Sequence, residues 1–310
     1  MAVPKPLSLP TRGYERGFSW EYEAPAPPPS RVLTPVVLDD LWLNTGDQAN
    51  GLCVVVENLT GWLDSPPLEG NDVARVISDG ASWGPKVLGP RSITISGAAT
   101  GPRELLGRFR DQLAAKAAKR VPVLLAVGDW DLQRVLTADV RAGSDQYRHR
   151  SLGSTGFKYE LTVTAADPAL YAGTWQTVTL TNQTEGITGR SLPREYPWHY
   201  AAGYLPNAAT LRNDGNHPAP VWALYEGDLE QSALVGGPDQ IVRVTRVDAG
   251  VAILVSCSAL TAEAEGGLSR ASYILPGSRP MWVPPGSTAR WFLRSSGRGQ
   301  VTLAWRSTWA

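Results

Sequence analysis

The chain has 310 residues, and its 29 basic and 29 acidic side chains balance to a formal net charge of zero. This balance gives no bulk electrostatic attraction to nucleic acid or to an anionic membrane, although a local basic patch is compatible with it. The length is that of about two domains, and 31 glycines and 25 prolines favour many turns. The composition therefore favours a β-rich protein.

The first thirty residues are set apart by seven prolines, Pro4, Pro6, Pro10, Pro25, Pro27, Pro28 and Pro29. Such a segment pairs poorly in a sheet and tends toward an extended or polyproline II conformation. Two interpretations stay open: a disordered tail, or an arm that lies on a neighbouring subunit through aromatic anchors. We treat residues 1–30 as a proline-rich N-terminal arm.

Short apolar runs separated by turns begin near residue 35. Runs at 36–38, 41–43 and 52–56 predict strands, and 73–77 is a candidate short strand in the loop-rich stretch from 61 to 84. Residues 92–96 alternate isoleucine with serine and threonine, the period of a half-buried strand. Pro122 places the apolar run 121–127 at a strand start or at a sheet edge.

A single amphipathic helix is predicted over residues 102–119. Gly101 can cap it, Pro102 suits the first helical position, and Glu104 lies near the positive helix end. Its apolar stripe consists of Leu105, Leu106, Phe109, Leu113, Ala114 and Ala117. A lone helix among strands must bury this stripe on a sheet, so we predict an α+β first domain over residues 31–172.

Two groups of basic residues need an interpretation. The first group, Arg103, Arg108, Arg110, Lys116, Lys119 and Arg120, surrounds the helix stripe and fits a solvated helix face. The second group is Arg141, Arg148 and Arg150, in a polar stretch from Arg141 to Gly156 that we predict to be a loop. If these three residues lined the inner surface of a ring, they could face passing DNA.

The clearest strand signal covers residues 157–165, where aromatic and aliphatic side chains alternate with polar ones until Asp167-Pro168 ends the run. After about residue 172 no helix signal remains. Short alternating runs recur about every ten residues, the spacing of a sandwich or barrel. These runs cover 176–181, 209–212, 219–225, 241–247, 251–257, 289–293 and 301–305. We predict an all-β sandwich over residues 173–310.

Motifs that carry chemistry are missing from the sequence. The three histidines, His149, His199 and His217, have no partner at metal-ligand spacing, and no zinc-protease, serine-hydrolase or phosphate-binding motif occurs. The carboxylate pairs Asp129 with Asp131 and Glu263 with Glu265 could serve a glycosidase, but such loop carboxylates are usually solvated. We predict a protein that is not an enzyme, with no catalytic residue, metal or cofactor.

The cysteines and the apolar runs bear on the cellular compartment. Cys53 and Cys257 lie far apart in apolar runs, which favours a reduced, buried pair and synthesis in the cytosol. The longest apolar runs are short, and the first thirty residues hold no signal-peptide core, so we expect no membrane insertion.

Twelve tryptophans are spread over the whole chain. Burial in the core or between domains accounts for some of them, and Trp305 is in phase with the core residues Val301 and Leu303. Exposed indoles would instead stack on sugars or lie in subunit contacts. A carbohydrate-binding module or adhesin that recognises host cell-wall glycans is therefore the alternative function.

Several segments, in their order, resemble the distal tail (Dit-like) proteins of long non-contractile-tailed bacteriophages, especially those of actinobacteria. The segments are 89–97 leading into the helix at Pro102, the strand ending at 161–171, the turn 211–216 with 218–221, and then 282–286 and 301–306. Together they span about residues 35–310. The arm and the stretch from Gly61 to Gly84 have no counterpart that we can assign.

The resemblance implies a fold and a role. The first domain would be a tail-tube-like sheet with one helix, six copies of which close into a ring, and the second a galectin-like sandwich. The chain would then be a structural virion protein of the tail tip that connects the tail tube to the tip or baseplate and leaves a channel for DNA. Its partners would be further copies of itself, the tail tube protein, the tape-measure protein and tail hub proteins, with assembly in the bacterial host cytoplasm.

Overall fold

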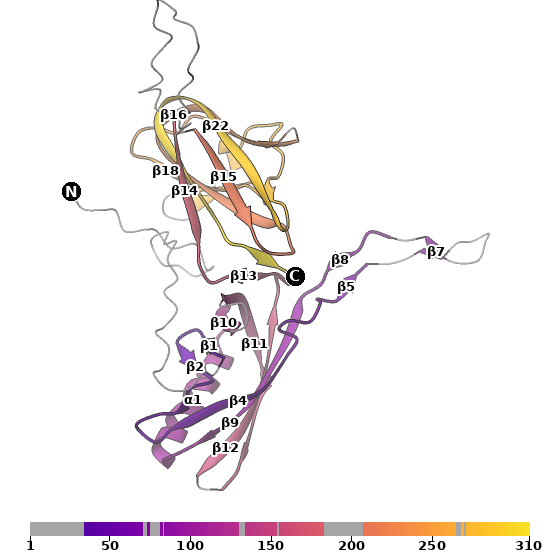
Figure 1. The fold of residues 1–310 in the computed structure, drawn as a ribbon, viewed down its shortest axis with the longest axis vertical. Coiled ribbons are helices and arrows are strands. Elements are labelled where there is room, and N and C mark those ends of the chain that lie inside the picture. The colour runs from indigo at the N-terminus through magenta and orange to yellow at the C-terminus, as the bar shows by residue number, and fades with distance from the viewer. Residues whose placement is uncertain are drawn as a thin grey trace, which may run out of the picture. The chain divides into compact units, whose positions relative to one another are not determined.

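The computed structural model describes residues 34–70, 73–74, 81–82, 84–129, 134–153, 155–182, 207–237, 239–264, 268–269 and 271–310. The predicted arm, residues 1–30, lies outside this part. The described chain forms two compact units, one that ends at Thr174 and one that runs from Trp175 to Trp309 (Figure 1). Strands predominate in both units, and α1 (Arg103–Ala117) is the only α-helix among the described residues, which confirms the mainly β fold class.

The first unit is built on one antiparallel sheet. Its strands are β1 (Val36–Leu38), β2 (Leu41–Trp42), β3 (Gly46–Asp47), β4 (Cys53–Thr60), β9 (Arg91–Thr100), β10 (Val123–Asp129), β11 (Arg134–Ser151), β12 (Gly156–Ala165) and β13 (Leu170–Ala172). Along the sheet the order is β2-β1-β10-β11-β12-β9-β4-β3, and β13 pairs with β11. Strand β10 begins directly after Pro122, so this proline marks a strand start rather than an edge strand.

Helix α1 lies on one face of this sheet and supplies much of its core (Figure 1). Leu106, Phe109, Leu113 and Ala117 are buried, whereas Leu105 is half-buried, so the buried stripe is narrower than predicted. The Phe109 ring packs against Phe157 and Tyr159 of β12, with centroid distances of 6.1 and 6.0 Å. The inward side chains of β12 therefore meet the helix, as their alternation predicted.

The two ends of α1 differ from the prediction in detail. The helix begins one residue later than expected, with Pro102 rather than Gly101 in the cap position. At the other end Lys116 and Lys119 are not simply solvated, because both donate to the Asp39 carboxylate, at 2.6 and 2.7 Å. Lys116 also pairs with Asp40. The basic end of the helix is thus tied to the β1–β2 turn.

The polar stretch from Arg141 to Gly156 is not the predicted loop. Strand β11 continues to Ser151 and pairs with β12 as far as Ser151 opposite Phe157. Tyr147 and His149 pair with Leu161 and Tyr159, so they lie on the helix side, and their rings stack at 6.1 Å. Tyr147 is half-buried there, whereas His149 is exposed, as are Arg148 and Arg150 on the other face. This alternation is masked in the sequence because the inward residues are themselves polar.

Between β4 and β9 the chain forms a narrow two-stranded ribbon, which Figure 1 shows running away from the sheet. Its strands are β5 (Leu68–Glu69) with β8 (Val87–Leu88), and β6 (Val73–Ala74) with β7 (Ala81–Ser82). Of the predicted strand 73–77, only β6 is among the described residues.

The buried side chain of Arg91 holds the base of the ribbon. It donates to the carbonyl oxygens of Trp62 and Pro168, at 2.8 and 2.9 Å, and also to those of Gly61 and Asp64. Burial lowers the pKa of this guanidinium, with an opposing effect from Asp64. The chain entering the ribbon is thereby fixed to the main sheet.

The second unit is all β, apart from one short 3-10 turn, η1 (Ala271–Tyr273), among the described residues. Its strands are β14 (Gln176–Thr181), β15 (Ala208–Asn213), β16 (Ala219–Gly237), β17 (Gln240–Val244), β18 (Ala252–Ser256), β19 (Thr261–Ala264), β20 (Leu268–Ser269), β21 (Trp282–Val283), β22 (Ser287–Trp305) and β23 (Thr308–Trp309). Most of these coincide with predicted runs.

The long strands β16 and β22 organise this unit. They pair from Val221 opposite Trp305 to Val235 opposite Phe292, and the remaining strands extend their two halves. β14 and β18 flank one half, β15 and β17 the other, and both halves turn side chains into one shared core. This arrangement is a sandwich whose two halves share one long antiparallel strand pair.

The predicted runs 289–293 and 301–305 are therefore two ends of a single strand. Gly297 and Gly299 lie between these two runs, and glycines at such a position are compatible with a turn. In the structure both glycines lie within β22, where the backbones of β16 and β22 approach closely. A Cβ at Gly297 would come within 2.3 Å of the Asp228 carbonyl oxygen, and one at Gly299 within 2.5 Å of the Leu229 side chain. The glycines allow close backbone approach without ending the strand.

We expect Leu113→Ala to lower the local stability of the first unit by about 2–5 kcal/mol, because it leaves a cavity between α1 and the sheet. Leu105→Ala is the matched control, and its cost should be about 1 kcal/mol or less because Leu105 is only half-buried. Hydrogen exchange of the β11 and β12 amides measures both effects. Equal losses of protection would contradict the packing described here.

Candidate functional site

The sheet face opposite α1 carries the three arginines singled out by sequence. In the β11–β12 ladder Arg141 pairs with Thr164, Arg148 with Glu160 and Arg150 with Lys158. Directly paired residues share a face, and the Thr164, Glu160 and Lys158 face of β12 is the one that points away from the helix. All three arginines are exposed and lie on this helix-free face, although an irregularity between Ala142 and Tyr147 separates Arg141 from the others.

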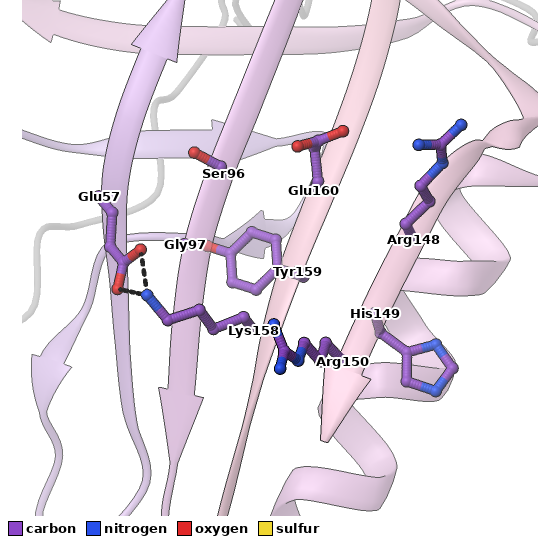
Figure 2. Close-up of a pocket in the computed structure, with 9 residues that line it drawn as sticks. All are labelled: Glu57, Ser96, Gly97, Arg148, His149, Arg150, Lys158, Tyr159 and Glu160. Carbon is purple, nitrogen blue, oxygen red and sulfur yellow. Dashed lines mark hydrogen bonds and ion pairs between the residues drawn. The ribbon is translucent and has the colours of Figure 1, made fainter. Parts of the chain in front are cut away.

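An open hollow of about 280 Å³ lies over this face (Figure 2). Its polar side chains come from four adjacent strands: Glu57, Ser96, Arg148, Arg150, Lys158 and Glu160. Gly97, His149 and Tyr159 also border the hollow. The site is therefore a strip across the sheet rather than an enclosed pocket.

The charges on this face are partly balanced. Lys158 donates to both carboxylate oxygens of Glu57 at 2.9 Å, and Figure 2 shows it reaching across β9 to do so. Glu160 lies opposite Arg148. Arg150 faces Lys158, a like charge, so Glu57 offsets a repulsion within the row. The face is mildly basic and polar.

Glu57 was not anticipated as part of the site, and a bulge explains why. The β4–β9 register shifts between Val56 and Asn58, so Glu57 is an extra residue without a partner on β9. Such bulges redirect a side chain, and simple alternation along β4 would not have identified it. Lys158 and Glu160, by contrast, lie on the face that sequence alternation had given them.

The opposite side of the same strands is closed by aromatic packing. Gly97 lies opposite Tyr159, and the missing side chain makes room for the Tyr159 ring. The Tyr159 hydroxyl donates to the Leu43 carbonyl oxygen at 3.1 Å. Burial raises the pKa of Tyr159, with Glu57 and Tyr147 acting in the same direction, so the hydroxyl stays protonated and keeps this bond.

The groups considered for catalysis or metal binding do not assemble into a site among the described residues. His149 packs edge-on to Phe157 at 6.4 Å, and no group of metal-binding side chains occurs in the described ranges. His199, Asp131 and Glu265 lie outside the described residues. Cys53 and Cys257 form no disulfide; Cys53 is half-buried rather than buried, and burial raises the pKa of Cys257 to about 12.

The described tryptophans of the second unit serve mainly in packing. Trp291 and Trp305 are core residues, and the Trp305 indole N–H donates to the Arg212 carbonyl oxygen at 2.8 Å, which confirms the predicted core position. Trp175 and Trp222 pack edge to face at 5.5 Å. Trp282 is 39% exposed. Trp282 is thus the one exposed tryptophan among the described residues of this unit.

We expect Gly97→Ala to destabilise the first unit by about 1–3 kcal/mol, because its Cβ would lie 2.3 Å from the Val55 carbonyl oxygen and 2.6 Å from the Tyr159 hydroxyl. Gly107→Ala is the matched control, since a Cβ on this helical glycine meets nothing within 4 Å and should stabilise by up to about 1 kcal/mol. Thermal unfolding of both variants tests the close packing; a neutral Gly97→Ala would refute it.

No described helix is long and apolar enough to cross a membrane.

Comparisons with known proteins identify the fold. No family model matches the chain, and no curated protein matches it. Among solved structures, the chain aligns with the SPP1 Dit protein (gp 19.1), which is described as a paradigm of the hub adsorption apparatus in phages that infect Gram-positive bacteria. The alignment has a TM-score of 0.59 and 13% sequence identity, and it covers 90% of this chain and 100% of the SPP1 protein. A chain of the phage P2 baseplate aligns at 0.49 and 7%, over 88% and 98%. The sequence resemblance is thus confirmed at the level of the fold, and the chain has the fold of the SPP1 Dit protein.

Proposed function

We propose that the chain is a structural protein of a phage tail tip, forming a ring that joins the tail tube to the tip or baseplate and leaves a channel for DNA. The observation that carries the proposal is that α1 covers only one face of the first-unit sheet. One face is sealed by α1, and the other is a polar strip with Arg141, Arg148 and Arg150 exposed. The likeness of the whole chain to the Dit fold supports it.

The two edges of the sheet suit a closed ring of identical copies. One edge ends in the two-residue strand β2, and the other ends in β3, which covers only Val54 and Cys53 of the eight-residue strand β4. A head-to-tail ring needs two different surfaces that complement one another. Pairing of the β4 edge with a neighbour would supply backbone hydrogen bonds. Six copies is the number that the family resemblance implies.

The helix-free face has the charge expected of a conduit. Arg141, Arg148 and Arg150 would meet phosphates, while Glu57 and Glu160 moderate the field. Each additional phosphate contact strengthens DNA binding in a salt-dependent way. A mildly basic surface would therefore attract the phosphates of passing DNA only weakly and would not bind the DNA tightly.

The remaining parts of the proposal follow from this role. The ring would contact the tail tube protein, the tape-measure protein and tail hub proteins, with DNA only as transient cargo. It would be assembled in the host cytoplasm and would not insert into a membrane. The role is mechanical, so it needs no catalytic group or cofactor.

The ring is tested by the mass of the full chain in solution and in purified tails. We expect an oligomer in at least one of them and six-fold symmetry in images of the tail tip. A strictly monomeric chain in solution that is also absent from purified tails would overturn the proposal.

The channel face is tested by Arg148→Glu with Arg150→Glu. Both side chains are exposed, and the like charge that Arg148→Glu places opposite Glu160 is offset by the attraction that Arg150→Glu gains opposite Lys158. We therefore expect assembly to be preserved, the free energy of unfolding to change by less than about 1 kcal/mol, and DNA ejection to be impaired, because phosphates are now repelled. Arg108→Glu, on the exposed side of α1, is the matched control and should leave ejection normal. Equal ejection by all variants would show that this face does not meet DNA.

A further inference from the structure

Two surfaces of this chain, one on each unit, are chemically complementary and lack partners within the described residues. The first is on the ribbon, where Glu69 pairs with Val87 across β5 and β8. Directly paired residues share a face, so the ribbon face combines a carboxylate with an aliphatic side chain. Val87 is 64% exposed, and Glu69 is exposed and forms no ion pair with a described residue.

The ribbon has little stability by itself. A two-stranded hairpin is only marginally stable in water, and this one also exposes Leu68, at 65%, on its other face. Its sequence from 61 to 90 holds four carboxylates against two basic side chains, so its net charge is −2. An acidic ribbon with exposed aliphatic residues would gain stability from a basic, partly apolar surface.

The second surface is on the outer side of the β15-β22-β16-β17 sheet and is called here the arginine face. In the ladder Phe292 lies opposite Val235, which lies opposite Ile241, and these three half-buried side chains form an apolar row. The neighbouring row places Arg294 opposite Ala233 and Ala233 opposite Arg243. The inward residues between them, Leu234, Trp291 and Leu293, belong to the core, so the arginine face points outward.

Three arginines border the apolar row without carboxylate partners among the described residues. Arg290 lies with its guanidinium carbon 5.0 Å from the Phe292 ring centroid, and Arg243, Arg290 and Arg294 are all exposed. The described ion pairs of this unit involve other arginines, Arg212, Arg246 and Arg279. Arginine and aromatic residues are enriched at the centres of protein–protein interfaces. An apolar row that contains Phe292 and is bordered by three arginines has this composition.

We propose that the ribbon face of one copy docks on the arginine face of a second copy. Val87 would cover the apolar row of Val235, Ile241 and Phe292, and Glu69 would pair with Arg294 or its neighbouring arginines. We take the partner to be a second copy because a head-to-tail ring needs two different, complementary surfaces on every copy, and this chain carries such a pair, a carboxylate with an aliphatic residue and arginines with an apolar row. This inference rests on the proposed ring, in which every copy presents both surfaces to its neighbours.

A charge swap tests the contact in the full chain. Arg294→Glu and Glu69→Arg should each lower the association constant, measured by sedimentation, by about tenfold or more, because like charges then face each other. The double variant should recover to within about threefold of the unmodified chain. Arg298→Glu is the matched control, since Arg298 lies on the same strand but opposite Asp228 and outside the arginine face.

The apolar part has its own matched pair. Val87→Ser should weaken association, and Leu68→Ser, equally exposed but on the other side of the ribbon, should not. Equal effects of the two serine variants, equal effects of the two arginine reversals, or additive losses in the double variant would each overturn the inference.

Disulfide trapping shows which chains are joined. Chains with Glu69→Cys mixed with chains with Arg294→Cys should give a covalent dimer whose 69–294 link is identified by mass spectrometry. Each single variant alone controls for links through Cys53 and Cys257. A 69–294 link that forms only within one chain carrying both cysteines would overturn docking between copies.

The outcomes also separate this inference from the proposed function. A six-fold ring that ignores the substitutions at Arg294, Glu69 and Val87 would refute the docking and leave the ring intact. A chain that is monomeric in solution and absent from tails would refute both.

Discussion

The packing of α1 on a single face of the first-unit sheet is the constraint on which the rest depends. Phe109 and Leu113 fill that face, and Gly97 makes room for the Tyr159 ring against it. With no second helix among the described residues, the other face stays open and can carry only polar side chains or a partner. A one-sided sheet of this kind is suited to lining a surface rather than to enclosing a substrate.

Much of the fold could be predicted because its strands follow simple alternation. The β12 strand and the β14 strand were expected within a residue of their bounds, since one face of each meets apolar neighbours. The continuation of β11 was missed because Tyr147 and His149, which face the helix, are polar enough to look like loop residues. Likewise, β22 was predicted as two separate runs, 289–293 and 301–305, because Gly297 and Gly299 break the apolar alternation between them. Their role in close backbone approach cannot be recognised without the partner strand.

The candidate site divides in the same way. Arg148 and Arg150 lie on the same face as Lys158 and Glu160 because a regular ladder joins them, and that ladder is readable once β11 is extended. Glu57 could not be placed, since its position depends on a bulge opposite β9. Nor could the binding of Lys116 and Lys119 to Asp39, because this contact joins segments far apart in the sequence. The alternation of residues along one strand predicts which face of the sheet a side chain lies on. Which residues it contacts depends on strand pairing and on segments that are distant in the sequence.

The zero net charge of the chain hides a separation of charge that matters for assembly. The ribbon is acidic, whereas the arginine face and the helix-free sheet face hold basic side chains with few carboxylates. In the proposed docking, the acidic ribbon of one copy meets the arginine face of the next. Such heterologous contacts close into a ring only when the rotation between copies permits it. Charge separation without net charge would therefore allow attraction between copies with little general affinity for nucleic acid, which is the combination that the proposed ring needs.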